Sequence, residues 1–256
     1  PVVTTMAYKQ IKYEIADTTA TITLNRPEAM NALTVVMMNE IHRAIKTAVD
    51  DSQVRSIVIT GEGRAFCAGL DLKEMDDRNI SKGYVGEVVD LPAQDLIKTI
   101  ENAPKPVIGK INGFCFTGAL ELALSLDFLV VANESKFGDT HAKWGLRPTW
   151  AMSARLPSAV GVRKARELSF TAGTFTGVQA AEWGLANYAV PRDELDAKVK
   201  EITDKVAENS EGSVAAFKDL YQHWLTGSVE DGVQYELATD YEIADTAQRV
   251  SGFSKR

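Results

Sequence analysis

Glu121 interrupts an otherwise apolar run, Gly118-Ala119-Leu120-Glu121-Leu122-Ala123-Leu124, which is typical of a helix. A carboxylate in such a run is either buried, which is unfavourable, or faces a cavity. Removal from water raises the pKa of a carboxyl group and suits it to general acid or base catalysis near neutral pH. The alternative is a Glu on a helix surface that pairs with a Lys or Arg. The apolar neighbours favour the catalytic interpretation.

A second candidate for proton transfer, His141, follows twenty positions later in the segment Phe137-Gly138-Asp139-Thr140-His141. Imidazole has an unperturbed pKa of about 6.5 and can act as an acid or a base at neutral pH. Asp139 is two residues away on an extended segment, where it shares a face with His141 and could orient the ring. The alternative is a His141 that bonds Asp139 or a backbone carbonyl and does no chemistry.

Two turns that contain glycine follow short apolar strands, at residues 64–75 and 112–121. In each turn a small residue, Ala68 or Gly118, leaves its backbone N–H accessible. Gly118 also begins the apolar helix, where N–H groups have no partner within the helix. Two such N–H groups that converge on one oxygen form an oxyanion hole. On spacing alone, ordinary strand–helix connections are the favoured interpretation of both turns, and an oxyanion hole formed by Ala68 and Gly118 is the alternative.

Strand-like and helix-like segments alternate through the first two thirds of the chain, which predicts an α/β fold with βαβ connections. Thr34 fits the N-cap of an amphipathic helix, and residues 76–91 are expected to form a mobile loop. From residue 195 strand signals disappear. We therefore divide the chain into a core domain, 1–194, and a helical C-terminal region, 195–256. The expected strands are 11–15, 20–24, 56–60, 107–111 and 128–132, and the later helices are 118–126, 195–209, 213–226 and 229–245.

Composition and charge exclude several classes of protein. The net charge is −7 and no block of Lys or Arg occurs, so nucleic-acid binding is not expected. No apolar run reaches the roughly 18 residues that a membrane span needs. Cys67 and Cys115 lie among apolar residues and outside any CxxC motif, which indicates packing thiols in a reducing compartment rather than a zinc site or a disulfide. The cytoplasm is the expected location, or an organelle matrix if a transit peptide was removed.

Blocks of sequence along nearly the whole chain resemble the crotonase (enoyl-CoA hydratase/isomerase) superfamily. They occur in the order of that family and include Leu24-Asn25-Arg26-Pro27, Phe66-Cys67-Ala68-Gly69-Leu70-Asp71, Lys105-Pro106-Val107-Ile108, residues 118–123, Phe137-Gly138, and residues 155–161 and 180–186. The resemblance implies a spiral of repeated ββα units, with a helical C-terminal region that mediates assembly into homotrimers or dimers of trimers. It also implies that Ala68 and Gly118 donate to a thioester carbonyl.

The resemblance further implies an acyl-CoA thioester as substrate, with coenzyme A as part of that substrate and no other cofactor or metal. Relatives often carry Lys at the position of Glu28. Trp144 and Trp150 are interpreted either as core residues or as walls of an acyl pocket. The expected binding residues are Arg26, Glu28, Ala29, Met30, Ala68, Gly69, Leu70, Asp71 and Trp144, with Phe253 and Lys255 reaching in from the C-terminus.

In hydratases of this family, a Glu at the position of Glu121 holds and activates water, and a second Glu lies where this chain has His141. The leading prediction is therefore reversible hydration of a 2-enoyl-CoA, with Glu121 directing water and His141 protonating the α-carbon of the enolate. One alternative is another reaction on the same scaffold, such as isomerisation, decarboxylation or hydrolysis. The other is a protein that binds acyl-CoA without turnover.

Overall fold

The strands form two sheets. The computed structural model describes residues 7–75, 82–83 and 85–253. A six-stranded sheet has the order β1-β2-β3-β5-β7-β10, and a four-stranded sheet has the order β4-β6-β8-β9. The strands are β1 (Ile11–Ala16), β2 (Thr19–Leu24), β3 (Ser56–Gly61), β4 (Ala65–Cys67), β5 (Val107–Ile111), β6 (Phe114–Phe116), β7 (Phe128–Ala132), β8 (Lys136–Gly138), β9 (Thr174–Thr176) and β10 (Tyr188–Val190).

Successive strand pairs build a spiral. β3 and β4, then β5 and β6, then β7 and β8 each place one strand in the large sheet and the next in the small sheet. The β1–β2 hairpin is antiparallel, whereas β2, β3, β5 and β7 run parallel to one another. Helix α1 (Val35–Asp50) follows the β1–β2 hairpin, α2 (Glu87–Asn102) follows β3 and β4, and α3 (Gly118–Leu124) follows β5 and β6. This is the ββα spiral that the resemblance implied.

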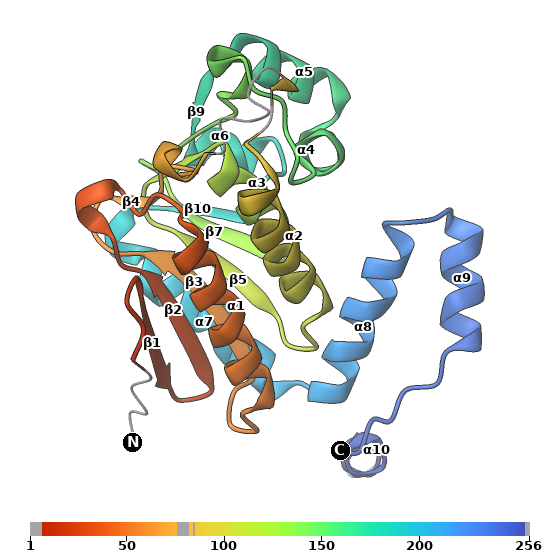
Figure 1. Cartoon of the computed structure of the whole chain (residues 1–256). Coiled ribbons are helices and arrows are strands. Elements are labelled where there is room, and N and C mark those ends of the chain that lie inside the picture. The colour runs from red at the N-terminus through yellow and green to blue at the C-terminus, as the bar shows by residue number, and fades with distance from the viewer. Residues whose placement is uncertain (1–6, 76–81, 84, 254–256) are drawn as a thin grey trace.

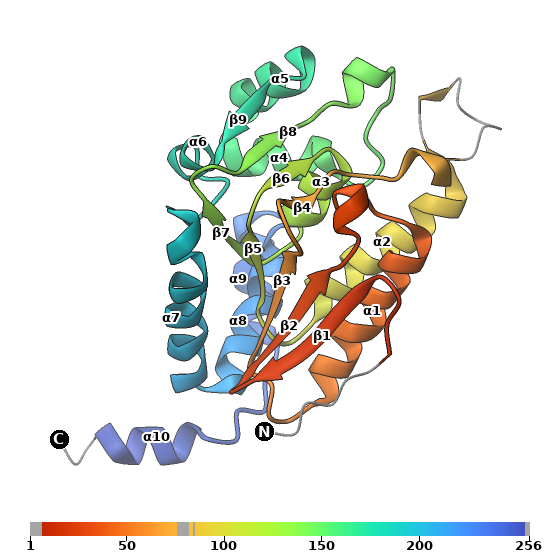
Figure 2. The same cartoon turned by 90° about the vertical axis from the view of Figure 1, so that its left-hand side faces the viewer.

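Helices cover both faces of the six-stranded sheet (Figures 1 and 2). α1 and α2 pack on one face through a large apolar cluster that includes Ile41, Ile45 and Leu96. α7 (Leu195–Glu208) packs on the other face, where Leu195 and Val199 contact a smaller cluster of buried strand residues. The boundary predicted at residue 195 thus coincides with the start of a helix that packs on the core sheet.

The remaining helices lie in two groups. α4 (Met152–Val160), α5 (Val162–Thr171) and α6 (Gly177–Glu182) surround the small sheet, whereas α8 (Glu211–Trp224), α9 (Val229–Ala238) and α10 (Thr246–Phe253) extend away from the core (Figure 1). Short 3₁₀ turns lie at Pro27–Ala29, Leu72–Glu74, His141–Trp144 and Arg192–Glu194. Several large apolar side chains on α8–α10 are exposed, such as Tyr221, Leu225 and Leu237. In the described part of the chain, no helix is both long and apolar enough to cross a bilayer.

Local sequence signals located five of the six strands of the large sheet and several of the helices, but they missed β10 and the strands of the small sheet. The Thr34 side chain caps α1 by accepting from the N–H of Met37 at 3.0 Å, as predicted. The loop predicted at 76–91 is wrong from Glu87 onward, because α2 begins there; residues 76–81 and 84 lie outside the described residues. The helix predicted at 229–245 is also too long. α9 ends at Ala238, and the Tyr241 hydroxyl beyond it donates to Asp219 on α8.

Candidate active site

Glu121 lies in the first turn of α3, and its side chain is almost fully buried. One carboxylate oxygen, Oε1, accepts from the backbone N–H groups of Trp150 and Met152, each at 3.2 Å. Burial raises the pKa of Glu121 to about 7, although His141 and the two N–H groups act in the opposite direction. A carboxyl group with this pKa can exchange a proton near neutral pH. The burial of Glu121 excludes the alternative of a surface Glu that pairs with Lys or Arg.

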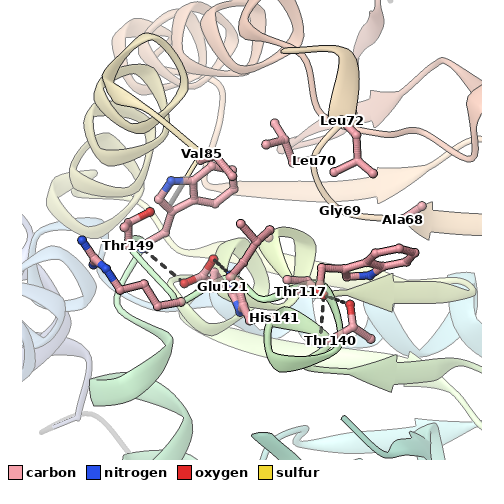
Figure 3. Close-up of a pocket in the computed structure, with 15 residues that line it drawn as sticks. Ala68, Gly69, Leu70, Leu72, Val85, Thr117, Glu121, Thr140, His141 and Thr149 are labelled. Atoms are coloured by element: carbon pink, nitrogen blue, oxygen red, sulfur yellow. Dashed lines mark hydrogen bonds and ion pairs between the residues drawn. The ribbon is translucent and has the colours of Figure 1, made fainter. Parts of the chain in front are cut away.

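His141 lies beside Glu121, as predicted. Its Nε2 atom is 3.7 Å from Oε2 of Glu121, and its Nδ1 atom is 2.7 Å from Oδ1 of Asp139. Figure 3 shows His141 and Glu121 side by side at the same wall of a pocket. The distance between Nε2 and Oε2 is too long for a direct hydrogen bond but suits two groups that share a water molecule or a reacting atom.

Asp139 holds His141 from the side away from Glu121. Burial raises the pKa of Asp139, but hydrogen bonds from His141 and from Ser169 outweigh it, so the net pKa lies below the ordinary value. The Ser169 hydroxyl, on α5, donates to Oδ2 of Asp139 at 2.7 Å. The pairing of Asp139 with His141 was predicted; Ser169 was missed, because nothing in the local sequence links it to a residue thirty positions earlier.

The turn before α3 presents the amide of Gly118. Thr117 has φ 52° and ψ −106°, an unfavourable conformation for a β-branched residue. Its N–H donates to the carbonyl of Gly138, and its hydroxyl is hydrogen-bonded to that of Thr140 at 2.6 Å. These bonds hold the turn in place. In the described structure the N–H of Gly118, the first residue of α3, has no hydrogen-bond acceptor, so it is available to a ligand.

The loop opposite requires a correction. The N–H of Ala68 donates to the carbonyl of Met30 at 3.0 Å, so the oxyanion role predicted for Ala68 is wrong: this amide is already occupied. The parallel bridge between Leu33 and Leu70 uses the N–H of Asp71 and the carbonyl of Gly69, which directs the N–H of Leu70 away from Leu33. Among the described residues the Leu70 amide has no acceptor. It is the free donor of this loop.

Gly69 brings the two turns together. It has φ 104°, and a Cβ atom built on it would lie 2.9 Å from the carbonyl oxygen of Phe116 and 3.8 Å from the nitrogen of Gly118. Only glycine fits this conformation and this close approach. No local pattern marks the Leu70 amide as the free one, because its state depends on the distant bridge to Leu33. The size of the Ala68 side chain was the wrong criterion.

A cavity of about 220 Å³ lies between these two turns and the acid/base pair (Figure 3). Leu70 and Gly118 line it from the two turns, and Glu121 and His141 line it from one wall. Pockets that enclose drug-sized ligands usually measure about 300–1,000 Å³, so this cavity suits a small group rather than a whole large ligand. The other lining residues are Ala68, Gly69, Leu72, Val85, Thr117, Thr140, Trp144, Leu146, Arg147, Thr149 and Trp150.

The two tryptophans contribute to the cavity in different ways. Trp150 is buried, and its indole N–H donates to Asp90 on α2 at 2.8 Å. A Cβ atom on Gly118 would lie 2.6 Å from its ring, so Trp150 packs directly over the start of α3. Trp144 is 61% exposed, so the interpretation of Trp144 as a core residue is wrong, and it lines the cavity from the outside.

The segment at 26–30 lies beside the 68–71 loop. Arg26 donates to Asp71 at 3.1 Å and to the carbonyl of Ala32 at 2.7 Å, and Met30 accepts from Ala68. Glu28 is exposed and Ala29 is half-buried in the short turn at Pro27–Ala29. The structure therefore brings together the two segments predicted to bind CoA. The Arg26 side chain, however, is occupied within the protein.

The C-terminal helix lies far from the cavity of its own chain. α10 ends at Phe253 and lies at the opposite end of the molecule from α3 (Figures 1 and 2). The side chain of Phe253 lies outside the described part of the structure, so the ligand contact predicted for it stays a prediction. Lys255 lies outside the described residues.

The cysteines lie behind the site. Both are free and fully buried in neighbouring strands, β4 and β6. Burial raises the pKa of the Cys67 thiol to about 12 and that of Cys115 as well, which keeps both thiols protonated and unreactive. Among the residues that the structure describes, no three or more His, Cys, Asp or Glu side chains are grouped to hold a metal ion.

Comparison with known proteins decides the family. A sequence model of the family described as "Enoyl-CoA hydratase/isomerase" matches residues 14–255. The chain belongs to this family, and so to the crotonase superfamily. Among similar family members, the chain is 37% identical over 218 residues to "Probable enoyl-CoA hydratase 1, peroxisomal" of Arabidopsis thaliana, covering 85% of this chain and 77% of that protein. It is 36% identical to "Crotonyl-CoA hydratase" of Syntrophomonas wolfei, covering 90% and 88% of the two chains.

Solved structures of the family share the fold. The enoyl-CoA hydratase from Bacillus anthracis superposes with a TM-score of 0.86 at 27% identity, over 96% of each chain. An enoyl-CoA hydratase from Mycobacterium avium has 33% identity and a TM-score of 0.73, over 96% of this chain and 100% of that one. The spiral architecture is therefore that of the enoyl-CoA hydratase/isomerase family.

Proposed function

We propose that this chain is an enzyme that catalyses the reversible hydration of a 2-enoyl-CoA thioester. One observation carries the proposal: the buried pair Glu121 and His141 faces a cavity across which two backbone amides have no acceptor among the described residues. Such amides stabilise an oxyanion, and such a pair can move the two protons that hydration requires. The names of similar proteins, among them a crotonyl-CoA hydratase, support the same reaction.

The amides of Leu70 and Gly118 are the proposed oxyanion hole, in place of Ala68 and Gly118. The thioester carbonyl oxygen accepts from both N–H groups, and the adjacent C2=C3 double bond then lies toward Glu121 and His141. When water adds at C3, the electron pair of the double bond moves to the carbonyl oxygen and forms an enolate. Two fixed donors stabilise this charge in a site largely shielded from water.

Proton transfer divides between the two side chains. The Glu121 carboxylate accepts a proton from the water as its oxygen bonds to C3, and protonated Nε2 of His141 gives its proton to C2. The product is a 3-hydroxyacyl-CoA, with Glu121 protonated and His141 neutral. A proton then passes from Glu121 to Nε2 across the 3.7 Å gap, directly or through water, and restores the starting state.

The CoA moiety is placed along the two segments at 26–30 and 68–71. They lie side by side through the Ala68–Met30 hydrogen bond and the Arg26–Asp71 ion pair, and the second segment lines the cavity. Because Arg26 is already paired and Glu28 is acidic, we assign recognition here to backbone groups rather than to side-chain cations. The cavity itself holds the acyl group and the thioester, with Trp144 at its outer wall.

The test is a panel of acyl-CoA thioesters analysed by mass spectrometry, with crotonyl-CoA as the first substrate. The wild type is expected to add one water to at least one 2-enoyl-CoA. Glu121→Gln and His141→Ala are each expected to lower kcat by roughly 10²–10⁴-fold. Glu134→Gln, at an exposed turn, is the matched control and keeps wild-type kcat.

Two outcomes would overturn this assignment. Turnover of other acyl-CoA esters without hydration of any 2-enoyl-CoA would assign another reaction to the scaffold. Tight binding of these esters without any turnover would indicate a binding protein. Full activity in both site variants would remove Glu121 and His141 from the mechanism.

A homotrimer, alone or paired into a hexamer, is the proposed assembly. Apolar side chains of α8 and α9, such as Tyr221, Leu225 and Leu237, remain exposed in the single chain, and a groove of about 640 Å³ separates α8 from the core. A second copy of the chain would bury this surface. Sedimentation analysis of wild type and Leu237→Asp tests the assembly. For location we keep the cytoplasm or an organelle matrix; similar proteins are named for the peroxisome and the mitochondrion.

A further inference from the structure

A series of hydrogen-bonded polar side chains extends from His141 away from the cavity, through Asp139 to Ser169. Oδ1 of Asp139 accepts from the backbone N–H of His141 at 3.2 Å and is 2.7 Å from Nδ1 of the same residue. Its other oxygen, Oδ2, accepts from Ser169 at 2.7 Å. One carboxylate thus holds both the backbone and the ring of His141, and a helix from another part of the chain holds the carboxylate.

Asp139 has little other compensation for its charge. It is 3% exposed, and among the described residues it forms no ion pair with Lys or Arg. A buried carboxylate without hydrogen-bond donors is strongly unfavourable, so the donors on His141 and Ser169 keep it in place. Because an ionised carboxylate can only accept, it requires a proton on Nδ1. The proton that changes during any reaction is then the one on Nε2.

We propose that Asp139, held by Ser169, is a positioning residue of this site: it keeps a proton on Nδ1 of His141 and directs Nε2 toward Glu121 and the cavity. The effect that we expect on catalysis rests on the proposed hydration reaction. Its geometric part concerns the tautomer of His141 and is independent of which substrate is used.

A purely structural role for Asp139 predicts something different. An Asp that bonds the backbone N–H two residues later is common in turns and would stabilise the start of the 3₁₀ turn at His141–Trp144. That role requires neither the contact to Nδ1 nor the hydroxyl of Ser169. The decisive readouts are therefore the position of the ring proton and kcat, rather than stability alone.

Asp139→Ala is the main test. Asn would not serve, because its Oδ1 could still accept from the backbone N–H and from Nδ1 of His141 while its Nδ2 donates to Ser169, whereas Ala removes the acceptor that keeps the proton on Nδ1. At a pH at which the ring is neutral, we expect ¹⁵N NMR of histidine-labelled wild type to show the Nδ1–H tautomer of His141, and the variant to show the Nε2–H tautomer. We expect kcat for crotonyl-CoA hydration to fall by roughly 10²–10³-fold with KM changed less than about threefold.

Ser169 supplies a second test if Asp139→Ala fails to fold. Ser169→Ala removes the hydroxyl that holds Oδ2 and is expected to lower kcat by about 5–20-fold, whereas Ser169→Thr restores a hydroxyl and recovers most of the loss. Ser158→Ala is the matched control, since this exposed serine of α4 only donates to the carbonyl one turn earlier and is expected to keep wild-type kcat.

The outcomes separate the two claims. An unchanged tautomer in Asp139→Ala overturns the positioning role, whether or not kcat falls. A Ser169→Ala variant with wild-type kcat overturns the part assigned to Ser169. If the wild type hydrates no 2-enoyl-CoA, the proposed function fails, yet the NMR comparison still decides whether Asp139 sets the tautomer.

Discussion

One wall of the cavity presents functional side chains, and the opposite wall presents a backbone amide. On one wall, Glu121 and His141 present ionisable side chains, each held by hydrogen bonds from outside its own element. On the other wall, the 68–71 loop presents the Leu70 amide, while the side chains that it contributes to the cavity, those of Ala68 and Leu70, are small or apolar. The first wall should therefore be sensitive to side-chain substitution. The second should be sensitive to its backbone and tolerant of side-chain changes.

The sharpest test of this contrast removes single N–H groups from the 68–71 loop. An ester in place of the amide at Leu70, introduced through the α-hydroxy analogue of leucine, deletes the free donor and is expected to lower kcat by roughly 10²–10³-fold. The same change at Ala68 deletes the bond to Met30 and is expected to lower the free energy of unfolding by about 1 kcal/mol, with kcat within about fivefold. Activity assays and denaturant titrations measure both. If the two ester substitutions lowered kcat equally, the assignment of the oxyanion donor to Leu70 rather than Ala68 would be refuted.

A substitution at Gly118 tests the start of α3, which presents a backbone amide on the same helix as the Glu121 side chain. In Gly118→Ala the new Cβ would lie 2.6 Å from the Trp150 ring, which Asp90 holds by its indole N–H. The start of α3 must shift, and kcat is expected to fall by about 10–100-fold with a loss of stability of about 1–3 kcal/mol. Gly252→Ala, which meets open space in α10, is the control. A Gly118→Ala enzyme with wild-type kcat would show that activity does not depend on the close packing of Trp150 over the start of α3.

The buried carboxylate of Glu121 is expected to lower the free energy of unfolding, and this loss should depend on pH. Its folded-state pKa of about 7 exceeds the ordinary 4.5, so the native state binds the proton more tightly than the unfolded state. Stability is then lost as pH rises from about 4.5 through 7, by up to about 3 kcal/mol. Glu121→Gln is expected to be inactive yet more stable than wild type at pH 8, with this difference absent at pH 4. Thermal unfolding at both pH values measures it; a variant less stable than wild type at pH 8 contradicts the assigned pKa.

The smallest effect is expected at the Leu70 side chain. Leu70→Ala retains the amide, so kcat is expected to stay within about threefold of wild type, while KM rises because apolar contact with the acyl group is lost. Michaelis kinetics with crotonyl-CoA separate the two constants. A fall in kcat as large as that of the ester would mean that the loop acts through its side chain, and the contrast between the walls would disappear.

Features that depend on neighbouring residues were predictable. The N-cap at Thr34, five of the six strands of the large sheet, and the burial of Glu121 follow from patterns within a few residues. The pairing of Asp139 with His141 also followed, because residues two apart on an extended segment share a face. By contrast, the start of α2 was missed, since its apolar face gains its stability from packing on α1 rather than from a local signal.

The sequence by itself determined the family, the α/β spiral and the choice of Glu121 and His141 as neighbours in a buried site, because these depend on residue types and their order. Only the tertiary structure decided which amides are free. Ala68 is occupied because Met30, nearly forty positions earlier, lies against it, and Leu70 is free because its bridge to Leu33 uses the groups on either side. Ser169 likewise meets Asp139 only through the packing of α5. Hydrogen bonds between distant segments depend on how the chain folds back on itself, and no local pattern records them.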